Sequence, residues 1–369
     1  MANNHKKWIN LAILEASRSL GITGKNPPVG CVIVNNNVLI SYGRTSSSGR
    51  PHAEENALNK VEDKNLLQNA NMYLTLEPCA HKSKLGKSCA ELINDTGISE
   101  VFICCMDPDP RTNGNGIDYL KKNGIKVYEH FFERDAVDLY KGFFSRIKKN
   151  KPFVTLKIAC SLDGKIALKN KKSKWITNEL SRRSTHFLRA QNDAILTSSS
   201  TIISDNPLLN CRLDGMANRS PDVVILDRYL KINKNFKIFQ NNFKNKMYIY
   251  SIDDSYNGSY ETKKLNTTIV DKNLNNKDYF NFIFSDLASK GINNLLIEVG
   301  AKLSTILLSL NLIDNLIIYR SGKIIGNDGL PFINDLNNDC IEKLKNYKIS
   351  FVRILDDDVL EIRNHSNEA

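Results

Sequence analysis

The chain has 369 residues, of which 41% are hydrophobic and 25% charged, and its formal net charge is +11. This length exceeds one typical hydrophobic core, so two domains are expected, and the composition is that of a soluble globular protein rather than a disordered one. No apolar run approaches the roughly 20 residues that cross a bilayer, and the N-terminal stretch carries Glu15 and Arg18, unlike a signal peptide. We therefore expect a cytoplasmic protein that does not bind a membrane.

The positive charge raises the question of a nucleic-acid partner. The lysines are spread thinly, however, with only a short run at 148–151. A basic balance also suits an anionic small substrate or cofactor through electrostatic steering, so we expect no nucleic-acid partner. The eight cysteines show no compact spacing typical of a disulfide framework. In a reducing compartment they are expected to be thiols, with a subset available to bind a metal.

The first half of the chain alternates helical and strand patterns. Residues 5–20 carry apolar side chains at helical spacing, and the stretch 21–28 ends that helix. Two β-rich runs around the Asn35–Asn37 turn predict a hairpin over 29–34 and 38–42. The pattern then predicts a helix opening at Pro51, strands at 72–76 and 101–105, and helices at 89–97 and 114–123. Strands that alternate with helices in this way predict a three-layer α/β domain.

The pattern breaks near residues 146–152, and we place a domain boundary there, giving domains 1–147 and 148–369. The second half restarts with a predicted strand at 153–159. Further β-type runs, several of them separated by helical stretches, are at 193–197, 222–227, 247–251, 293–299 and 314–320. This order predicts a second α/β domain of a size that suits one core.

The most specific signal in the sequence is a set of metal-binding residue types. His52 is followed by Glu54, then by Cys79 after Pro78, and then by Cys89. Zinc favours imidazole nitrogen and thiolate sulfur, and a catalytic zinc site needs three protein ligands with an open fourth position for water. One His and two Cys meet this need, and Glu54 can act as the general acid and base. The same residues define the zinc nucleobase deaminases, in which the Glu is not a ligand.

Two structural interpretations compete with this one. Cys79 and Cys89 could be core thiols with His52 at the surface, which would be the first choice for any one of them alone. A purely structural zinc site would normally be closed by a fourth His or Cys, and His81 could supply that ligand. The two ordered pieces, each with a mechanistic reason, favour the catalytic interpretation.

Three stretches of the first half resemble the bifunctional riboflavin-biosynthesis deaminase–reductase family: 26–31, 51–54 and 75–81, together with 106–110 after the metal residues. The resemblance implies that the first domain is cytidine-deaminase-like, that His52, Cys79 and Cys89 bind Zn²⁺, and that Glu54 moves the proton. Asn26 and the loop after it would line the pyrimidine pocket. The loop from Cys79 to Cys89 is one residue longer than is usual in the family, and Lys87 and Ser88 replace two prolines before Cys89. We expect this change to loosen the loop that presents Cys89.

The second half lacks the glycine pattern of a Rossmann dinucleotide site. Instead, the predicted strand at 293–299 runs into Gly300 and a helix that begins with Lys302, Ser304 and Thr305, which together suit an anion. A hydroxyl-rich helix entry at 196–201 is a second candidate. Either feature alone is more often structural, as an ordinary strand–helix junction or as N-capping by Ser and Thr.

Segments over 153–215 and 292–306 match the reductase half of the same family in order and spacing, which implies a dihydrofolate-reductase-like domain. The resemblance implies that NADPH is contacted by Ala159, Trp175, Thr201, Asp205, Gly300, Ala301, Lys302, Leu303, Ser304, Thr305 and Ile306, with Arg228 as a weaker candidate. The expected substrate contacts are Ser173, Arg189, Leu209, Arg212 and Glu298, the arginines being suited to a phosphate. For Trp175 the alternative is simple core packing.

The sequence therefore predicts two consecutive steps of riboflavin synthesis in one chain. The first is zinc-dependent deamination of a phosphorylated ribosylaminopyrimidine, and the second is reduction of its ribosyl group by NADPH. The competing hypotheses are a deaminase of cytidine, guanine or RNA with a recognition module, a zinc-stabilised binding protein, and an active deaminase with a degenerate second domain. Resemblance to the family also suggests a homo-oligomer.

Overall fold

The computed structural model describes residues 2–81, 86–170, 175–240, 245–255, 264–336, 340 and 346–365. The chain forms two compact units, Met1–Lys151 with Ala288–Asn293, and Pro152–Leu287 with Asn294–Ala369. The division lies between Lys151 and Pro152, just after helix α6 (Lys141–Lys149), and the domain limits 1–147 and 148–369 stay a prediction. No helix in the described ranges is long and apolar enough to cross a membrane.

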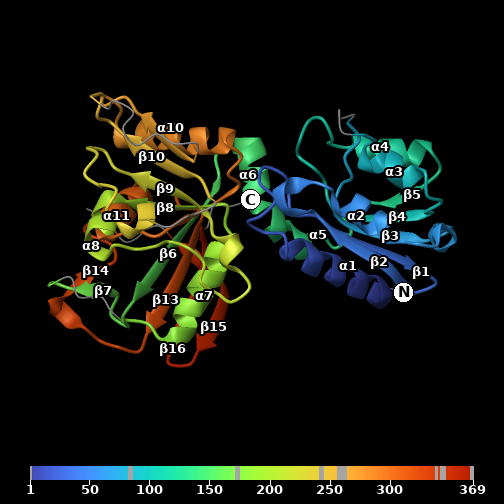
Figure 1. Ribbon diagram of the computed structural model, residues 1–369. Coiled ribbons are helices and arrows are strands. Elements are labelled where there is room, and N and C mark those ends of the chain that lie inside the picture. Colours follow the sequence, from blue (N-terminus) through green and yellow to red (C-terminus); the bar gives the residue numbers. More distant parts are fainter. Residues whose placement is uncertain are drawn as a thin grey trace. The chain divides into compact units, whose positions relative to one another are not determined.

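The first unit is built on a five-stranded sheet in the order β2-β1-β3-β4-β5 (Figure 1). Its strands are β1 (Gly30–Asn35), β2 (Val38–Arg44), β3 (Asn71–Leu76), β4 (Glu100–Cys105) and β5 (Lys126–Tyr128). β1 runs antiparallel to both β2 and β3, whereas β3, β4 and β5 are parallel. β3 and β4 are buried along almost their whole length, as expected for strands with helices on both faces.

Helices cover the two faces of this sheet and make it three-layered. Gly30 faces Ala12 of α1 (Ala2–Ser17), and Gly43 faces Ala53 and Ala57 of α2 (Ala53–Asn59). Gly30 and Gly43 belong to adjacent register pairs of the β1–β2 ladder and therefore point to opposite faces. α3 (Cys89–Asn94) packs beside α2, and α4 (Asn115–Lys122) beside α3. α5 (Glu133–Ala136) and α6 complete the helices of this unit.

The second unit contains a nine-stranded sheet in the order β11-β10-β9-β8-β12-β6-β13-β16-β15. The seven strands from β11 to β13 in this order are mutually parallel, and β16 pairs antiparallel with both β13 and β15. The strands are β6 (Phe153–Cys160), β8 (Ala194–Ser198), β9 (Asp222–Leu226), β10 (Met247–Ser251), β11 (Leu265–Ile269), β12 (Asn294–Ile297), β13 (Asn315–Ser321), β15 (Tyr347–Leu355) and β16 (Asp358–His365). A separate small sheet pairs β7 (Lys165–Leu168) with β14 (Gly329–Pro331).

The helices of the second unit are α7 (Glu179–Ala190), α8 (Ser199–Asp205), α9 (Lys237–Gln240), α10 (Asn276–Ser289) and α11 (Ala301–Ser309). α8 follows β8 and α11 follows β12, and the two strands are neighbours in the sheet. Because the strands are parallel, β6, β8, β9 and β12 all end at one edge of the sheet. In an open α/β sheet that edge is where ligands bind.

The predicted elements agree with this structure. The α/β class, the hairpin, the two parallel strands before α3 and α4, and the six strands predicted for the second half are all present, with ends within about two residues. The sequence analysis did not identify β5, β7, β11, β14, β15 or β16. The β15–β16 hairpin is the largest of these omissions, because its two strands form one side of the nine-stranded sheet.

Candidate active sites

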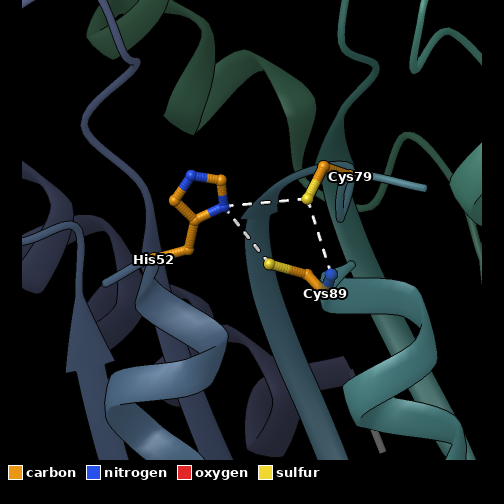
Figure 2. A group of neighbouring side chains, drawn as sticks. All are labelled: His52, Cys79 and Cys89. Atoms are coloured by element: carbon orange, nitrogen blue, oxygen red, sulfur yellow. Dashed lines mark hydrogen bonds between the residues drawn. The ribbon is translucent and has the colours of Figure 1, made fainter. Parts of the chain in front are cut away.

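His52, Cys79 and Cys89 converge in the first unit, each from the end of a regular element (Figure 2). His52 immediately precedes α2, Cys79 lies just beyond β3, and Cys89 is the first residue of α3. The His52 Nδ1 atom is 3.3 Å from the Cys89 sulfur and 3.7 Å from the Cys79 sulfur. The Cys89 amide donates to the Cys79 sulfur at 3.5 Å. A Ser88–Glu91 capping box fixes the start of α3 and hence the backbone of Cys89.

These distances fit a zinc ion. A nitrogen and a sulfur bound to tetrahedral zinc at ordinary bond lengths lie about 3.6 Å apart. The positive ends of α2 and α3 also favour thiolate over thiol. Within the described residues the cluster has three members and does not include His81, whose Nδ1 is buried without a hydrogen-bond partner. The site therefore has the three-ligand form of a catalytic zinc site rather than a closed, structural one.

The two sulfurs are electrostatically unequal without a metal. A hydrogen bond from Cys89 lowers the pKa of Cys79, and the same bond, with burial, raises the pKa of Cys89. The pair thus holds one proton that a divalent cation would displace. The nearby Glu54 is 3% exposed and lies in the first turn of α2. Burial raises the pKa of its carboxyl, which is the property expected of a group that both takes and returns a proton.

Asn26 lies in the loop before β1. Its Nδ2 donates to the carbonyl of Gly49 at 3.0 Å, and Gly49 is three residues before His52. Asn26 therefore ties the loop before β1 to the segment that leads into the metal site. Its contact with a pyrimidine stays a prediction.

In the second unit, two of the predicted substrate contacts form a buried ion pair. Arg189 of α7 binds Glu298, which directly follows β12, through two parallel bonds of 2.7 and 2.9 Å. Lys157 of β6 lies 3.9 Å from the same carboxylate. Burial alone would raise the pKa of Glu298, but Arg189 and Lys157 overcome that effect and lower it to about 2. Glu298 is consequently a fixed negative charge that holds two cations in place.

A third cation lies close to this group. Arg212 donates to the Asn210 side chain at 2.9 Å, while Arg189 donates to the Asn210 carbonyl at 3.1 Å. Burial and repulsion by Arg189 lower the pKa of Arg212, as expected for two guanidinium groups that face a common space. Leu209 is only 3% exposed and its side chain packs in a hydrophobic cluster, so any contact with a ligand would come from its backbone.

The predicted anion sites lie at the carboxyl edge of the same sheet. Gly300 is the N-cap of α11 and makes no side-chain cap, so no side chain satisfies the first amide groups of the helix. Lys302 is exposed, whereas Ser304 is buried and the Thr305 hydroxyl donates to the carbonyl of Ala301. Leu303 and Ile306 are half-buried on the same helix. The helix amides and Lys302 can therefore meet an anion, but the Thr305 hydroxyl is already engaged.

The remaining predicted cofactor contacts lie around this edge. Ala159 is near the end of β6, Thr201 is in the first turn of α8 with its amide bonded to the Ser198 hydroxyl, and Asp205 ends that helix. Arg228 follows β9 with its guanidinium 4.7 Å from the Tyr279 ring centroid. Ser173 lies outside the described residues.

Trp175 is 63% exposed, so it is not a core residue, and the Arg182 guanidinium lies 4.4 Å from its ring centroid. A hollow of about 470 Å³ is nearby, lined by Ile176, Asn178 and Lys323 among others, and the Lys323 ammonium donates to the Trp175 carbonyl. None of the predicted cofactor or substrate residues that the structure describes lines this hollow. In this region the exposed Trp175 ring is the group that can stack on a ligand.

Comparison with known proteins shows to which family the two units belong. Residues 2–105 match the cytidine and deoxycytidylate deaminase zinc-binding region, and residues 152–355 match the RibD C-terminal domain. The chain is 35% identical over 346 residues to the riboflavin biosynthesis protein RibD of Buchnera aphidicola, covering 90% of this chain and 91% of that protein. It superimposes on Acinetobacter baumannii RibD with a TM-score of 0.89, at 31% identity and over the full length of both chains. The chain belongs to the RibD family.

A second solved structure agrees with this assignment. It is that of a Thermotoga maritima diaminohydroxyphosphoribosylaminopyrimidine deaminase/5-amino-6-(5-phosphoribosylamino)uracil reductase, with a TM-score of 0.87 at 30% identity and 99% coverage of both chains. The predicted resemblance and fold are thereby confirmed. The chain is a RibD-type bifunctional enzyme of riboflavin biosynthesis, with a zinc-dependent deaminase and an NADPH-dependent reductase.

Two residues of this RibD-family chain stand out only in the structure. Lys157 was not predicted as a site residue, and it proves to be buried against Glu298, with its pKa lowered by burial. Glu77, next to the Pro78–Cys79 pair, is 3% exposed and binds backbone amides across the sheet edge. For Lys157 the available signal was a charged residue within the otherwise largely apolar strand β6.

Proposed function

We propose that the first unit hydrolytically deaminates 2,5-diamino-6-ribosylamino-4(3H)-pyrimidinone 5′-phosphate. The Thermotoga maritima relative supports this substrate, because it is a diaminohydroxyphosphoribosylaminopyrimidine deaminase. The observation that carries the proposal is the three-ligand cluster of His52, Cys79 and Cys89 beside a buried carboxylate. Zinc held by these residues supplies a Lewis acid that activates a water molecule for attack on C2 of the ring.

Glu54 carries out the proton transfers of this step. Its carboxylate accepts the first proton of the attacking water and passes it to the adjacent ring nitrogen, then takes the remaining hydroxyl proton and gives it to the amine that leaves C2, so ammonia departs and a carbonyl forms. A buried carboxyl with a raised pKa is suited to both halves of this exchange. Asn26 would hold the pyrimidine from the loop tied to Gly49.

We propose that the second unit reduces the deaminated product to 5-amino-6-ribitylaminouracil 5′-phosphate. Residues at the carboxyl edge of the sheet would hold NADPH, which would supply the hydride for C1′ of the ribose. Opening the ribose ring also requires one proton on the ring oxygen. Lys157 is the acid we assign to that proton, since it is buried beside the predicted substrate contacts and burial lowers its pKa.

The other predicted residues bind rather than react. Arg189 and Arg212 are positioned to share the phosphate of the substrate, and Glu298 keeps the Arg189 fork in one orientation. The open amide groups at the start of α11 suit the pyrophosphate of the cofactor, and Trp175 offers an exposed ring. Thr201, Asp205 and Arg228 remain proposed cofactor contacts, as does Ser173 for the substrate.

A coupled assay tests both steps in one sample. Zinc-loaded protein incubated with the diaminopyrimidinone phosphate is expected to release ammonia without NADPH. Addition of NADPH should then cause its oxidation, with a loss of absorbance at the reduced nicotinamide band. The same protein given no deaminated product should leave NADPH unchanged. Absence of both signals in protein shown to contain zinc would refute the proposal.

We also propose that the enzyme works in the cytoplasm as a homo-oligomer. All eight cysteines are free, as expected in a reducing compartment. In the described part of the chain β15 is an edge strand that pairs only with β16, and it exposes the apolar side chains of Ile349, Phe351, Val352 and Ile354. Antiparallel pairing of two copies centred on Phe351 would place Lys348 opposite Ile354 and Arg353 opposite Ile349, so no like charges would meet.

Light scattering after size-exclusion chromatography tests this assembly. Ile354→Glu would place a charge on the proposed interface and should shift the protein toward monomer. Ile269→Glu, on the opposite edge strand β11, is the matched control and should keep the wild-type mass. A wild-type mass for both variants, or a monomeric wild type, would contradict the β15 interface.

A further inference from the structure

Glu77 is a buried carboxylate close in sequence to the metal ligand Cys79, but it is not one of the three ligands. It immediately follows β3 and is two residues before Cys79. Its own amide donates to the carbonyl of Cys105 at 2.9 Å, which extends the ladder between β3 and β4 past the last paired residues. Only 3% of Glu77 is exposed, so its charge must be compensated within the protein.

The compensation comes from backbone amides of one segment. The Oε1 atom of Glu77 accepts from the amide of Gly116 at 3.0 Å. The Oε2 atom accepts from Gly114 at 3.1 Å and from Asp107 at 3.3 Å. These donors belong to the stretch 107–116, which leaves β4 and enters α4. The Glu77 side chain thus holds both ends of the 107–116 segment next to the end of β3, just before Cys79.

Two further contacts connect this hydrogen-bond network to the metal ligands Cys79 and Cys89. At Gly116 a β-carbon would lie 2.0 Å from the carbonyl oxygen of Pro78, so the start of α4 rests against the residue before Cys79. On the other side of Cys79, its carbonyl accepts from the amide of Ala90 at 3.1 Å, in the first turn of α3. Cys79 is therefore clamped between the Glu77 network and the helix that begins with Cys89.

The 107–116 segment also contains charged side chains that bind one another or the backbone. The Asp107 carboxylate is 8% exposed and accepts from the amide of Asp109 at 2.8 Å, and Asp109 binds the Arg111 guanidinium. A shift of the segment would therefore move the Cys79 ligand and this polar loop together. Groups that orient metal ligands from outside the coordination sphere commonly change metal affinity or activity by about 10–100-fold when removed.

We infer that Glu77 is a positioning residue of the deaminase, which sets the place of Cys79 and of the 107–116 segment through three backbone amide bonds. This inference rests on the proposed deaminase function. Glu77 is not a member of the metal-binding cluster, so its effect would pass through the position of the ligand Cys79. An amide in its place cannot accept on both arms, because one arm would turn N–H groups toward an N–H donor.

Glu77→Gln is the direct test, and Glu15→Gln is the matched control. Glu15, on helix α1, is also a nearly fully buried carboxylate of the first unit, but it pairs with Arg18 just after that helix and with Arg44 of strand β2. Both variants should lose some thermal stability. Only Glu77→Gln should change the visible absorption spectrum of the cobalt-substituted protein, lower kcat for ammonia release by about 10-fold or more, and leave the reductase rate within about 2-fold.

Gly116→Ala gives a second approach to the same contact. Its new methyl group would push the Pro78 carbonyl from the α4 side and should reproduce both the altered cobalt spectrum and the lower deaminase kcat. If Glu77→Gln does not accumulate as folded protein, Gly116→Ala carries the test alone.

Wild-type cobalt spectra in the folded variants, or a spectral change in Glu15→Gln as large as in Glu77→Gln, would overturn the inference. A wild-type protein that releases no ammonia would instead refute the proposed substrate. The cobalt spectra would still decide the role of Glu77, so the two failures can be told apart.

Discussion

Replacing Glu298 by Gln would remove the charge that holds Arg189 and Lys157 together. The pKa of Glu298 falls from an ordinary value of 4.5 to about 2 in the folded protein. A lowering of the pKa by this much corresponds to roughly 3 kcal/mol of stability at neutral pH. The side chains of all three partners are at most 14% exposed, so solvent screens them little. Removing one member of a buried pair commonly costs about 3–5 kcal/mol, which agrees with this figure.

The lowered pKa of Glu298 determines how this stabilisation changes with pH. Because the folded-state pKa is depressed, the stabilisation is fully present above the unfolded-state pKa near 4.5 and declines as the pH falls toward 2. At pH 3.5 it should have dropped to roughly 2 kcal/mol. The difference in free energy of unfolding between wild type and Glu298→Gln should therefore be about 3 kcal/mol at pH 7 and should shrink below pH 4.5. Acid effects on the zinc site are common to both proteins and cancel in the difference.

Urea unfolding measures this difference. The chain has two tryptophans, and in a Trp8→Phe background the fluorescence of Trp175 reports on the second unit. Glu361→Gln is the control for activity, since Glu361 is another buried carboxylate of this unit and pairs with Arg320 and Arg363. It should keep its NADPH oxidation rate, whereas Glu298→Gln should lose it. A loss of stability below about 1 kcal/mol at pH 7, or a difference that does not shrink in acid, would refute the reasoning.

Three further predictions separate the two active sites. Glu54→Gln should slow ammonia release by about 10²–10⁴-fold while zinc content and NADPH oxidation with deaminated substrate stay unchanged; slow ammonia release together with zinc loss would contradict a purely proton-transfer role. Cys89→Ala should lose zinc, measured by atomic emission after dialysis, and full occupancy would remove Cys89 from the ligand set. Lys157→Met should abolish NADPH oxidation but keep ammonia release and cofactor binding, and an unchanged reductase rate would exclude Lys157 as the acid.

Sequence patterns predicted the metal site well because zinc chemistry restricts the residue types. One imidazole, two thiolates and a carboxylate in a fixed order are compatible with few kinds of site, and the structure brings His52, Cys79 and Cys89 within 4.8 Å of one another. The longer loop before Cys89 did not displace it, since the capping box of Ser88 and Glu91 anchors the start of α3. The replacement that was expected to loosen the loop thus also supplied the cap.

Sequence patterns said less about the reductase. The family resemblance implied Arg189 and Glu298 separately, but not that the two bind each other, because they are far apart in sequence and only the fold brings α7 beside the end of β12. Nor did it reveal that the Thr305 hydroxyl is used within α11. The β15–β16 hairpin was missed although two β-rich runs flank the Asp356–Asp357 turn, a spacing that favours a hairpin.

Glu77 shows where sequence reasoning of this kind reaches its limit. Metal ligands must be particular side chains, so their pattern is visible in a sequence. The partners of Glu77 are backbone amides at 107, 114 and 116, which nearly every residue type provides. Only the parallel pairing of β3 with β4 brings these amides to the carboxylate. A residue that acts by collecting backbone donors therefore has no sequence signature of its own, and its role becomes visible only in the hydrogen bonds of the folded chain.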